Sequence, residues 1–162
     1  MQVKPAVERV ASALRGHGVV TEIIEFAQST RTAADAAAAV GTEIGSIVKS
    51  LVFLADTAPF LVLVSGMHRV SITRLSAALG APIRRADADV VRAATGFAIG
   101  GVAPVGHAAP LPVICDMDLL RYERVFAAAG TPNTMFPISP QDLVRITKAR
   151  VLDVREDVAA QA

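Results

Sequence analysis

Two apolar stretches, IVKSLVFL at residues 47–54 and FLVLV at residues 60–64, decide how this chain folds. Both are rich in β-branched and aromatic residues, which favour β-strands. The five residues between them, Ala55 to Pro59, include Asp and Pro, which are common in turns. The pattern therefore predicts two strands joined by a short turn.

Further elements follow from local signals along the chain. A second hairpin is expected from strands at 124–128 and 134–138 around Gly130 to Pro132. Capping residues, glycines and prolines mark where helices begin and end. We expect helices at 3–15, between Thr32 and Gly41, between Ser71 and Gly80, from Asp87 or Asp89 to Thr95, and from Ser139 onward, and a helical turn at 117–120. Other strands are expected at 19–26, 112–115 and 151–154. Because strands and helices do not alternate regularly, we predict an α+β fold with a mixed, mostly antiparallel sheet and surrounding helices.

Length and composition indicate one globular domain over residues 1–162. A chain of 162 residues can bury roughly 70% of its unfolded surface, which is enough for one core. Its 52% hydrophobic and 19% charged residues exclude disorder, although the tail after about residue 155 is expected to fray. We find no membrane span and no secretory signal, and a lone cysteine, Cys115, cannot form an internal disulfide. We therefore expect a cytoplasmic protein without membrane contact.

Charge is unevenly distributed although the net charge is only +1. Between Thr57 and Cys115 the acids are Asp87 and Asp89 alone, whereas the same stretch carries five arginines: Arg69, Arg74, Arg84, Arg85 and Arg92. A local basic patch of this kind could attract a phosphate backbone. The arginines could equally occupy the solvent faces of short helices, and composition alone leaves both interpretations open.

Lys49 breaks the pattern of its strand. It is one of three lysines in a chain with 13 arginines, and it lies among residues that are apolar on both faces apart from Ser50. A buried lysine is costly unless it is paired or its tip reaches a cleft. There its ammonium could bind an anion or polarise a carbonyl. The alternative is a lysine at the exposed start of a strand.

A glycine-rich segment, TGFAIGGVAPVGH at residues 95–107, is the second unusual feature. It is too apolar for a solvated linker, and its glycines would let a ligand approach backbone N–H groups, which bind phosphates or oxyanions. It lacks the lysine of a Walker loop and the spacing of a dinucleotide-binding loop. The alternative is a tight loop that crosses the end of a sheet.

Other chemistries find no support in the sequence. His17, His68 and His107 have no metal-ligand spacing, so we expect no metal. No serine lies in a nucleophile elbow, and Cys115 is interpreted as a buried strand residue.

Four segments together resemble one family. VKSLVF at 48–53 is similar to its lysine-bearing strand, LSAALGA at 75–81 to its helix-to-glycine segment, residues 95–107 to its glycine-rich loop, and LPVICD at 111–116 to the strand that leaves the loop. This is the YbaK/ProX family of aminoacyl-tRNA deacylases, which is related to the editing insertion domain of bacterial prolyl-tRNA synthetase. The resemblance extends from about residue 20 to residue 154.

The resemblance implies a mixed sheet curled into a partly closed barrel, with helices around it. It implies hydrolysis of the ester between an amino acid and the 3′ end of tRNA, without a metal or an organic cofactor. It places the family's functional lysine at Lys49 and its loop glycine and proline at Gly100 and Pro104. Ser50 stands where the cysteine-clearing subgroup has threonine, and the only tyrosine, Tyr122, lies far along the chain; no particular amino acid is assigned.

We therefore hypothesise a trans-editing hydrolase acting on the 3′ acceptor end of mischarged tRNA, with an aminoacyl-tRNA synthetase as a further partner. Backbone N–H groups near Gly100 and Gly101 would stabilise the oxyanion, Lys49 would fix the terminal adenosine or the carbonyl, and water would be the nucleophile. The expected catalytic residues are Lys49, Gly100 and Gly101, and the expected substrate-binding residues are Ser50, Thr95, Gly96, Phe97, Pro104, Gly106 and His107.

Two rival functions remain open from the sequence. A non-catalytic module would bind aminoacyl-tRNA ends or aminoacyl-nucleotides in partnership with a synthetase. A small-molecule esterase would act independently of tRNA and show little dependence on salt.

Overall fold

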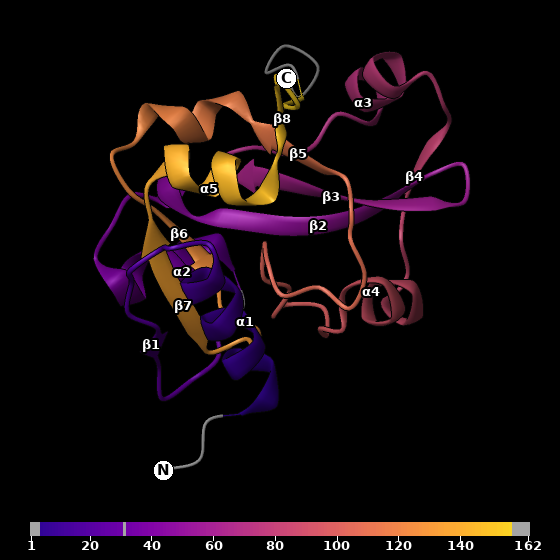
Figure 1. Ribbon diagram of the computed structural model, residues 1–162. Helices are drawn as coiled ribbons and strands as arrows, with labels where there is room; N and C mark the ends of the chain where they lie inside the picture. Colours follow the sequence, from indigo (N-terminus) through magenta and orange to yellow (C-terminus); the bar gives the residue numbers. More distant parts are fainter. Residues whose placement is uncertain (1–3, 31, 157–162) are drawn as a thin grey trace.

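The computed structural model describes residues 4–30 and 32–156 (Figure 1). Within these ranges it contains five α-helices, two 3₁₀ helices and eight strands. The helices are α1 (Pro5–Gly16), α2 (Ala33–Val40), α3 (Ile72–Leu79), α4 (Ala88–Thr95) and α5 (Pro140–Thr147), with the 3₁₀ helices η1 (Ile44–Ser46) and η2 (Met117–Arg121). The strands are β1 (Ile24–Glu25), β2 (Val48–Ala55), β3 (Ala58–Ser65), β4 (Ile83–Arg85), β5 (Val113–Asp116), β6 (Val125–Ala128), β7 (Thr134–Ile138) and β8 (Arg150–Leu152).

The strands form two sheets. The five-stranded sheet has the order β4-β2-β3-β5-β8, in which β2 is antiparallel to β3 and β4 while β5 is parallel to β3 and β8. Long connections precede β5 and β8, as parallel pairing requires. The three-stranded sheet, β1-β7-β6, is antiparallel throughout.

The predicted α+β class with mixed strand pairing is confirmed, whereas the expected single curled sheet is corrected to two. An isolated parallel bridge between Ile47 and Phe126 links the two sheets, and the described residues form no closed barrel. Closure would need a strand along the whole free edge of β2. The adjacent β4 pairs only with residues 53–55, so in the described ranges the edge of β2 has no partner strand between the Ile47–Phe126 bridge and Phe53.

The hairpin predicted from residues 47–64 is present and tighter than expected. Ala55 pairs with Ala58, which leaves a two-residue turn at Asp56 and Thr57. Asp56 adopts a left-handed φ of 55°, a conformation that Asp tolerates better than most residues. The two strands run side by side through the middle of the molecule (Figure 1).

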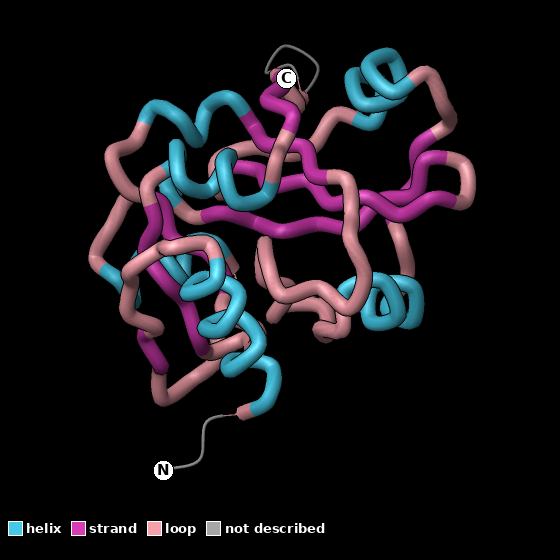
Figure 2. Tube along the Cα trace, in the orientation of Figure 1, coloured by secondary structure: helices cyan, strands magenta, loops and turns pink. Residues whose placement is uncertain are grey.

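Local capping signals set the helix starts. The side chains of Thr32, Ser71, Asp87 and Ser139 each accept a hydrogen bond from the backbone N–H three residues later, at the starts of α2, α3, α4 and α5. The helices lie on the outside of the two sheets (Figure 2). No helix among the described residues has both the length and the apolar character needed to cross a membrane.

One expected strand is shorter in the structure than in the prediction, and one strand was missed. The strand expected at 19–26 is reduced to Ile24 and Glu25, because only these two residues pair with β7. The short strand β4 was not expected. The proposed helix start at Val3 and the proposed fraying at 157–162 lie outside the described residues.

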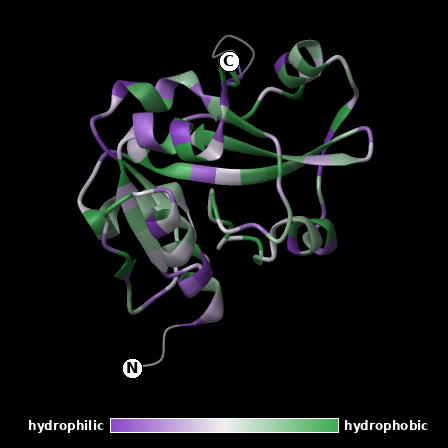
Figure 3. Cartoon of the chain, viewed as in Figure 1, coloured by the Kyte–Doolittle hydropathy of each residue, from purple (hydrophilic) through white to green (hydrophobic). Residues whose placement is uncertain are grey.

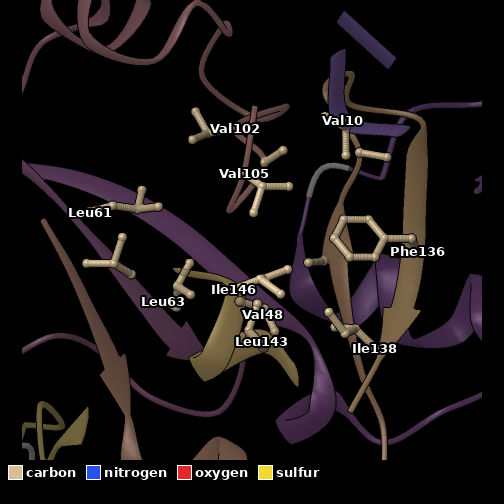
Figure 4. Packing of buried hydrophobic residues seen from close by; sticks show 14 of the residues in the cluster. Val10, Val48, Leu61, Leu63, Val102, Val105, Phe136, Ile138, Leu143 and Ile146 are labelled. Atoms are coloured by element: carbon tan, nitrogen blue, oxygen red, sulfur yellow. The ribbon is translucent and has the colours of Figure 1, made fainter. Parts of the chain in front are cut away.

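The hydrophobic core lies on both faces of the β2–β3 hairpin. The larger cluster joins α1, β3, β7, α5 and the glycine-rich segment, represented by Val10, Leu61, Phe136, Leu143 and Val102 (Figure 4). A second cluster, which includes Phe53, Val64 and Leu75, packs beneath α3. Burial on both faces explains why β2 and β3 are almost continuously hydrophobic (Figure 3).

Candidate functional site

A cavity of about 330 Å³ opens beside the free edge of β2. Its walls come from residues 47–52, from the start of α2, from residues 85–86 at the end of β4, from Ile99 and Gly100, and from residues 131–132 and 134–135 around the start of β7. This volume is at the lower end of the range for small-molecule sites. Segments more than 80 residues apart in sequence therefore meet around one hollow.

Lys49, Ser50 and Gly100 are the expected site residues that line this cavity. The sequence had placed them on two separate segments, and the fold brings these together. Thr95, Gly96, Phe97, Gly101, Pro104, Gly106 and His107 are not among the lining residues. Their roles must be judged from the contacts that they make.

Lys49 lies in the ladder opposite Val64, and its side chain is half-buried. Its Nζ donates a hydrogen bond to the carbonyl oxygen of His68 at 2.6 Å. Burial lowers the pKa of Lys49, the charges of Arg69 and Arg85 lower it further, and Asp116 opposes them. An ammonium has three donors, so Lys49 can hold the His68 carbonyl and still bind a ligand.

The loop that presents the His68 carbonyl is fixed by carboxylates. Nε2 of His68 lies 2.7 Å from Oδ2 of Asp118, which Arg155 also approaches at 3.5 Å. The buried Asp116 accepts from the backbone N–H groups of Ser65 and Asp118. His68, Asp116 and Asp118 offer ligand atoms within 4.8 Å of one another. Since both carboxylates already accept hydrogen bonds, we assign this cluster to holding the loop.

Ser50 presents both its backbone and its side chain to the cavity. The carbonyl of Val52 accepts from Ala86 N–H on the β4 side. Backbone groups two residues apart in an antiparallel strand point the same way, so the N–H and C=O of Ser50 also point away from β3. Pairing with β4 ends at Phe53, which leaves them at the open edge. Its buried Oγ has no hydrogen-bond partner among the described residues, which suits a polar ligand.

Gly100 and Gly101 differ in what their amides can do. Gly101 N–H donates to the carbonyl of Ala98 at 3.0 Å, and a Cβ at Gly101 would lie 2.9 Å from Cα of Thr131. Gly100 is exposed with φ 92°, and its N–H has no hydrogen-bond partner within the described ranges. The expected oxyanion role therefore fits Gly100. Gly101 instead allows close packing against the 130–131 backbone.

The rest of the glycine-rich segment packs on α1. The Arg9 guanidinium lies 4.6 Å from the centre of the buried Phe97 ring and donates to the carbonyl of Gly96 at 2.8 Å. A Cβ at Gly106 would come within 3.2 Å of the Arg9 carbonyl oxygen, so a larger residue would push the segment off the helix.

Hydrogen bonds within the segment complete this packing. Thr95 Oγ1 donates to the Val91 carbonyl and accepts from Phe97 N–H. Nε2 of His107 lies 2.7 Å from the Ala103 carbonyl oxygen, with the imidazole edge-on to Phe97. Pro104 is buried. The predicted substrate-binding role of Thr95, Gly96, Phe97, Pro104, Gly106 and His107 stays untested, and their contacts indicate a structural one.

Several cavity residues were missed in the sequence. Thr30, Thr32, Arg85, Thr131 and Thr134 all line the cavity. Thr32 had been recognised as a helix cap and Arg85 as part of a basic stretch. No local signal connects them, because they lie on segments up to about a hundred residues apart.

Comparisons with known proteins place this chain among related sequences and structures. Residues 27–146 match the model of a family described as the aminoacyl-tRNA editing domain. The protein YwhH of Bacillus subtilis (strain 168) is 30% identical over 138 residues, which cover 84% of this chain and 88% of that protein. A protein of Enterococcus faecalis, proposed to be a Cys-tRNA(Pro)/Cys-tRNA(Cys) deacylase, is 24% identical over 85% of this chain and 87% of its own length.

Longer proteins and solved structures extend the similarity. The proline–tRNA ligase of Geobacter sp. (strain M21) is 34% identical over 101 residues, which are 62% of this chain but only 18% of the ligase. The crystal structure of a protein proposed to be a trans-editing enzyme for prolyl-tRNA synthetase has a TM-score of 0.92 and 46% identity, with 96% of this chain and all of that chain covered. The family match and these relatives confirm the resemblance: this chain belongs to the aminoacyl-tRNA editing domain family, YbaK/ProX type.

Proposed function

We propose that this protein is a trans-acting aminoacyl-tRNA deacylase, which hydrolyses the ester of a mischarged tRNA. The observation that carries the proposal is the convergence of Gly100, Lys49 and Ser50 on one cavity. The cavity is large enough for an aminoacyl group and small enough to exclude most of a tRNA. Catalysis at the 3′ end therefore needs only that end to enter.

The chemistry required is modest because an aminoacyl ester is already activated. Water attacks the ester carbonyl, the carbon–oxygen bond to the ribose breaks, and free amino acid leaves while the ribose oxygen takes up a proton. The Gly100 N–H stabilises the developing oxyanion, as donors in such sites do. Ser50 orients the aminoacyl group through its hydroxyl and through its backbone N–H and C=O at the open edge of β2. The Lys49 ammonium holds the terminal nucleotide.

The relatives support the choice of substrate. One similar structure is described as a proposed trans-editing enzyme for prolyl-tRNA synthetase, and another relative as a proposed deacylase of Cys-tRNA(Pro) and Cys-tRNA(Cys). The matched part of the Geobacter ligase is a fraction of a much longer chain, which supports a protein that acts beside a synthetase. A synthetase partner and a cytoplasmic location remain predictions for this chain.

The direct test is hydrolysis of a panel of mischarged tRNAs by the purified protein. We expect release of amino acid from at least one member of the panel. We also expect Lys49→Ala to lower that rate at least about tenfold, since loss of the ammonium that holds the terminal nucleotide would misplace the ester relative to the Gly100 amide. Unchanged turnover by folded Lys49→Ala would remove this residue from the mechanism.

The same assay separates the rival functions. A non-catalytic module would bind the tRNAs without releasing amino acid. An esterase for small molecules would cleave simple aminoacyl esters as fast as aminoacyl-tRNA and with little dependence on salt. Either result would overturn the proposed deacylase.

A further inference from the structure

Three cations gather on one side of the β2 edge. Lys49 and Phe53 are four residues apart on β2, so their side chains lie on the same face of the strand. Arg85 pairs with Phe53 in the ladder and shares that face. Arg69 follows His68, whose carbonyl oxygen holds the Lys49 ammonium. The basic bias in the middle of the sequence thus has a specific place in the fold.

These arginines lack acidic partners. Arg74, from the same basic stretch, is paired with Asp153. By contrast, Arg69 and Arg85 are exposed and make no ion pair with any residue in the described ranges.

The acids near this cluster are already engaged. Asp116 is buried and accepts two backbone N–H groups, and Asp118 is held by His68 and Arg155. The positive charges of Arg69 and Arg85 are close enough to Lys49 to lower its pKa. Such like charges repel one another, and an anion bound between them offsets that repulsion.

The cluster also adjoins the cavity, because Lys49 and Arg85 both contribute to its lining. An anion bound by the cluster would therefore lie beside any group that occupies the cavity. In the proposed function that group is an aminoacyl ester on the last nucleotide of tRNA. The next anions along this substrate are the phosphodiesters that precede the terminal adenosine.

We propose that Arg69 and Arg85, together with Lys49, form a binding surface for the phosphodiester groups at the 3′ end of tRNA, beside the mouth of the cavity. This inference rests on the proposed function for the identity of the ligand. It defines the direction of approach: the acceptor end crosses the open edge of β2 from the face on which Phe53 and Arg85 lie. Arginine suits this role because its guanidinium binds phosphate oxygens in pairs.

Arg84 provides a matched control. It neighbours Arg85 on β4 and is also exposed, but it pairs with Leu54 and so points to the opposite face. Arg84→Gln removes the same charge from the same strand. A general effect of net charge would appear equally in Arg84→Gln and Arg85→Gln, whereas a local phosphate contact would appear only in the latter.

The first experiment measures binding, which does not require hydrolysis. A fluorescent, uncharged acceptor-stem minihelix ending in CCA is titrated with wild type, Arg69→Gln, Arg85→Gln and Arg84→Gln over a range of salt concentrations. We expect about three- to tenfold weaker binding for Arg69→Gln and Arg85→Gln, with a salt slope reduced by about 1 for each lost phosphate contact. Arg84→Gln should behave as wild type.

Two outcomes of this titration would overturn the inference. One is an equal loss in Arg84→Gln and Arg85→Gln, which would show an effect of net charge alone. The other is displacement of the minihelix by inorganic phosphate as readily as by a CCA trinucleotide at equal phosphate concentration, which would show a site for a free anion. Preferential displacement by the trinucleotide supports the assignment to nucleic acid.

The second experiment compares two substrates, a mischarged tRNA and the matching aminoacyl-adenosine, which has no phosphate. Arg69→Gln and Arg85→Gln should lower kcat/KM for the tRNA several-fold more than for the aminoacyl-adenosine. Equal losses on both substrates would contradict a phosphate contact. If wild type hydrolyses neither substrate, the proposed deacylase fails, and the binding titration still decides whether the cluster holds a nucleic acid.

Discussion

The glycine-rich segment has a middle and two flanks, all rich in glycine and apolar residues, and the fold uses them differently. In the middle, Ile99 and Gly100 are exposed and line the cavity. In the flanks, Phe97 and Gly106 pack against α1, Thr95 is hydrogen-bonded to its neighbours, and His107 lies edge-on to Phe97. A glycine in such a loop can either leave its backbone N–H free for a ligand or allow a neighbouring backbone to pack closely against it. The contacts of each glycine, rather than the glycine itself, decide which.

The largest expected effect is a loss of stability when packing in the flanks of the segment is removed. Phe97→Ala removes a fully buried ring and should lower the free energy of unfolding by about 3 to 5 kcal/mol. Chemical denaturation measures this directly. If the variant does not fold, Phe97→Leu should show a smaller loss, of about 1 to 2 kcal/mol, while deacylation per folded molecule persists. A stable Phe97→Leu without activity would place Phe97 in the site and contradict the comparison.

The next effect concerns activity at the middle of the segment, which lines the cavity. Gly100→Val should lower the deacylation rate about 100-fold, equivalent to about 2.7 kcal/mol, because its side chain projects at the cavity and disturbs the amide donor. Gly41→Val is the control, since Gly41 has a similar left-handed φ of 71° at the end of α2 with open space around it. Both substitutions strain the backbone, but only the one at Gly100 should abolish turnover. Normal turnover by a folded Gly100→Val protein would refute the loop assignment.

A smaller effect is expected where the first flank of the segment, Gly96 and Phe97, meets α1. Arg9→Ala removes the cation above Phe97 and the donor to the Gly96 carbonyl, and should reduce stability by about 1 kcal/mol. Thermal denaturation should show a decrease of about 2 to 4 °C in Tm. Arg15→Ala, which loses only an exposed ion pair with Glu8 on the same helix, should change stability by less than about 0.5 kcal/mol. Equal losses of stability in Arg9→Ala and Arg15→Ala would show that the contacts of Arg9 with Phe97 and Gly96 add nothing to stability.

The smallest effect is a pH dependence at His107. Burial lowers its pKa, the hydrogen bond with the Ala103 carbonyl opposes this, and Arg9 adds to the lowering. The folded state thus binds the proton more weakly than the unfolded state. The contribution of neutral His107 to stability should therefore be fully present above the pKa of the unfolded state, about 6.5. It should decline as the pH falls below that value and through the lower pKa of the folded state.

His107→Gln provides the control for this pH dependence, because it retains a hydrogen-bond donor without titrating. Between about pH 7.5 and 5.5, Tm should fall more steeply for wild type than for His107→Gln. Parallel curves for the two proteins would show that His107 contributes nothing to the pH dependence.

Local signals predicted the local elements well. Four helix starts were identified from their capping residues, because a cap bonds only three residues along the chain. The β2–β3 hairpin was also identified from local signals, because its two strands are joined by a short turn and pair with each other. The strand at 19–26 was overestimated because its extent depends on pairing with β7, which lies more than a hundred residues away.

The candidate site could be predicted only in part. Lys49 and Gly100 were found because each breaks a local rule and because both match the family pattern. The threonines of the cavity carry no such signal, since their position depends on contacts between distant segments. The two glycines could not be distinguished either, because the hydrogen bond from Gly101 to Ala98 depends on the conformation of the turn.

The most direct test of the account compares the middle of the glycine-rich segment with its two flanks in one measurement. Backbone amide chemical shifts of the isotope-labelled protein are recorded while a hydrolysis-resistant aminoacylamido-adenosine is added. We predict the largest changes at the amides of Gly100 and Ser50, with little change at Gly96 and Gly106. Changes concentrated at Gly96 and Gly106, with none at Gly100, would contradict the assignment of the cavity as the binding site.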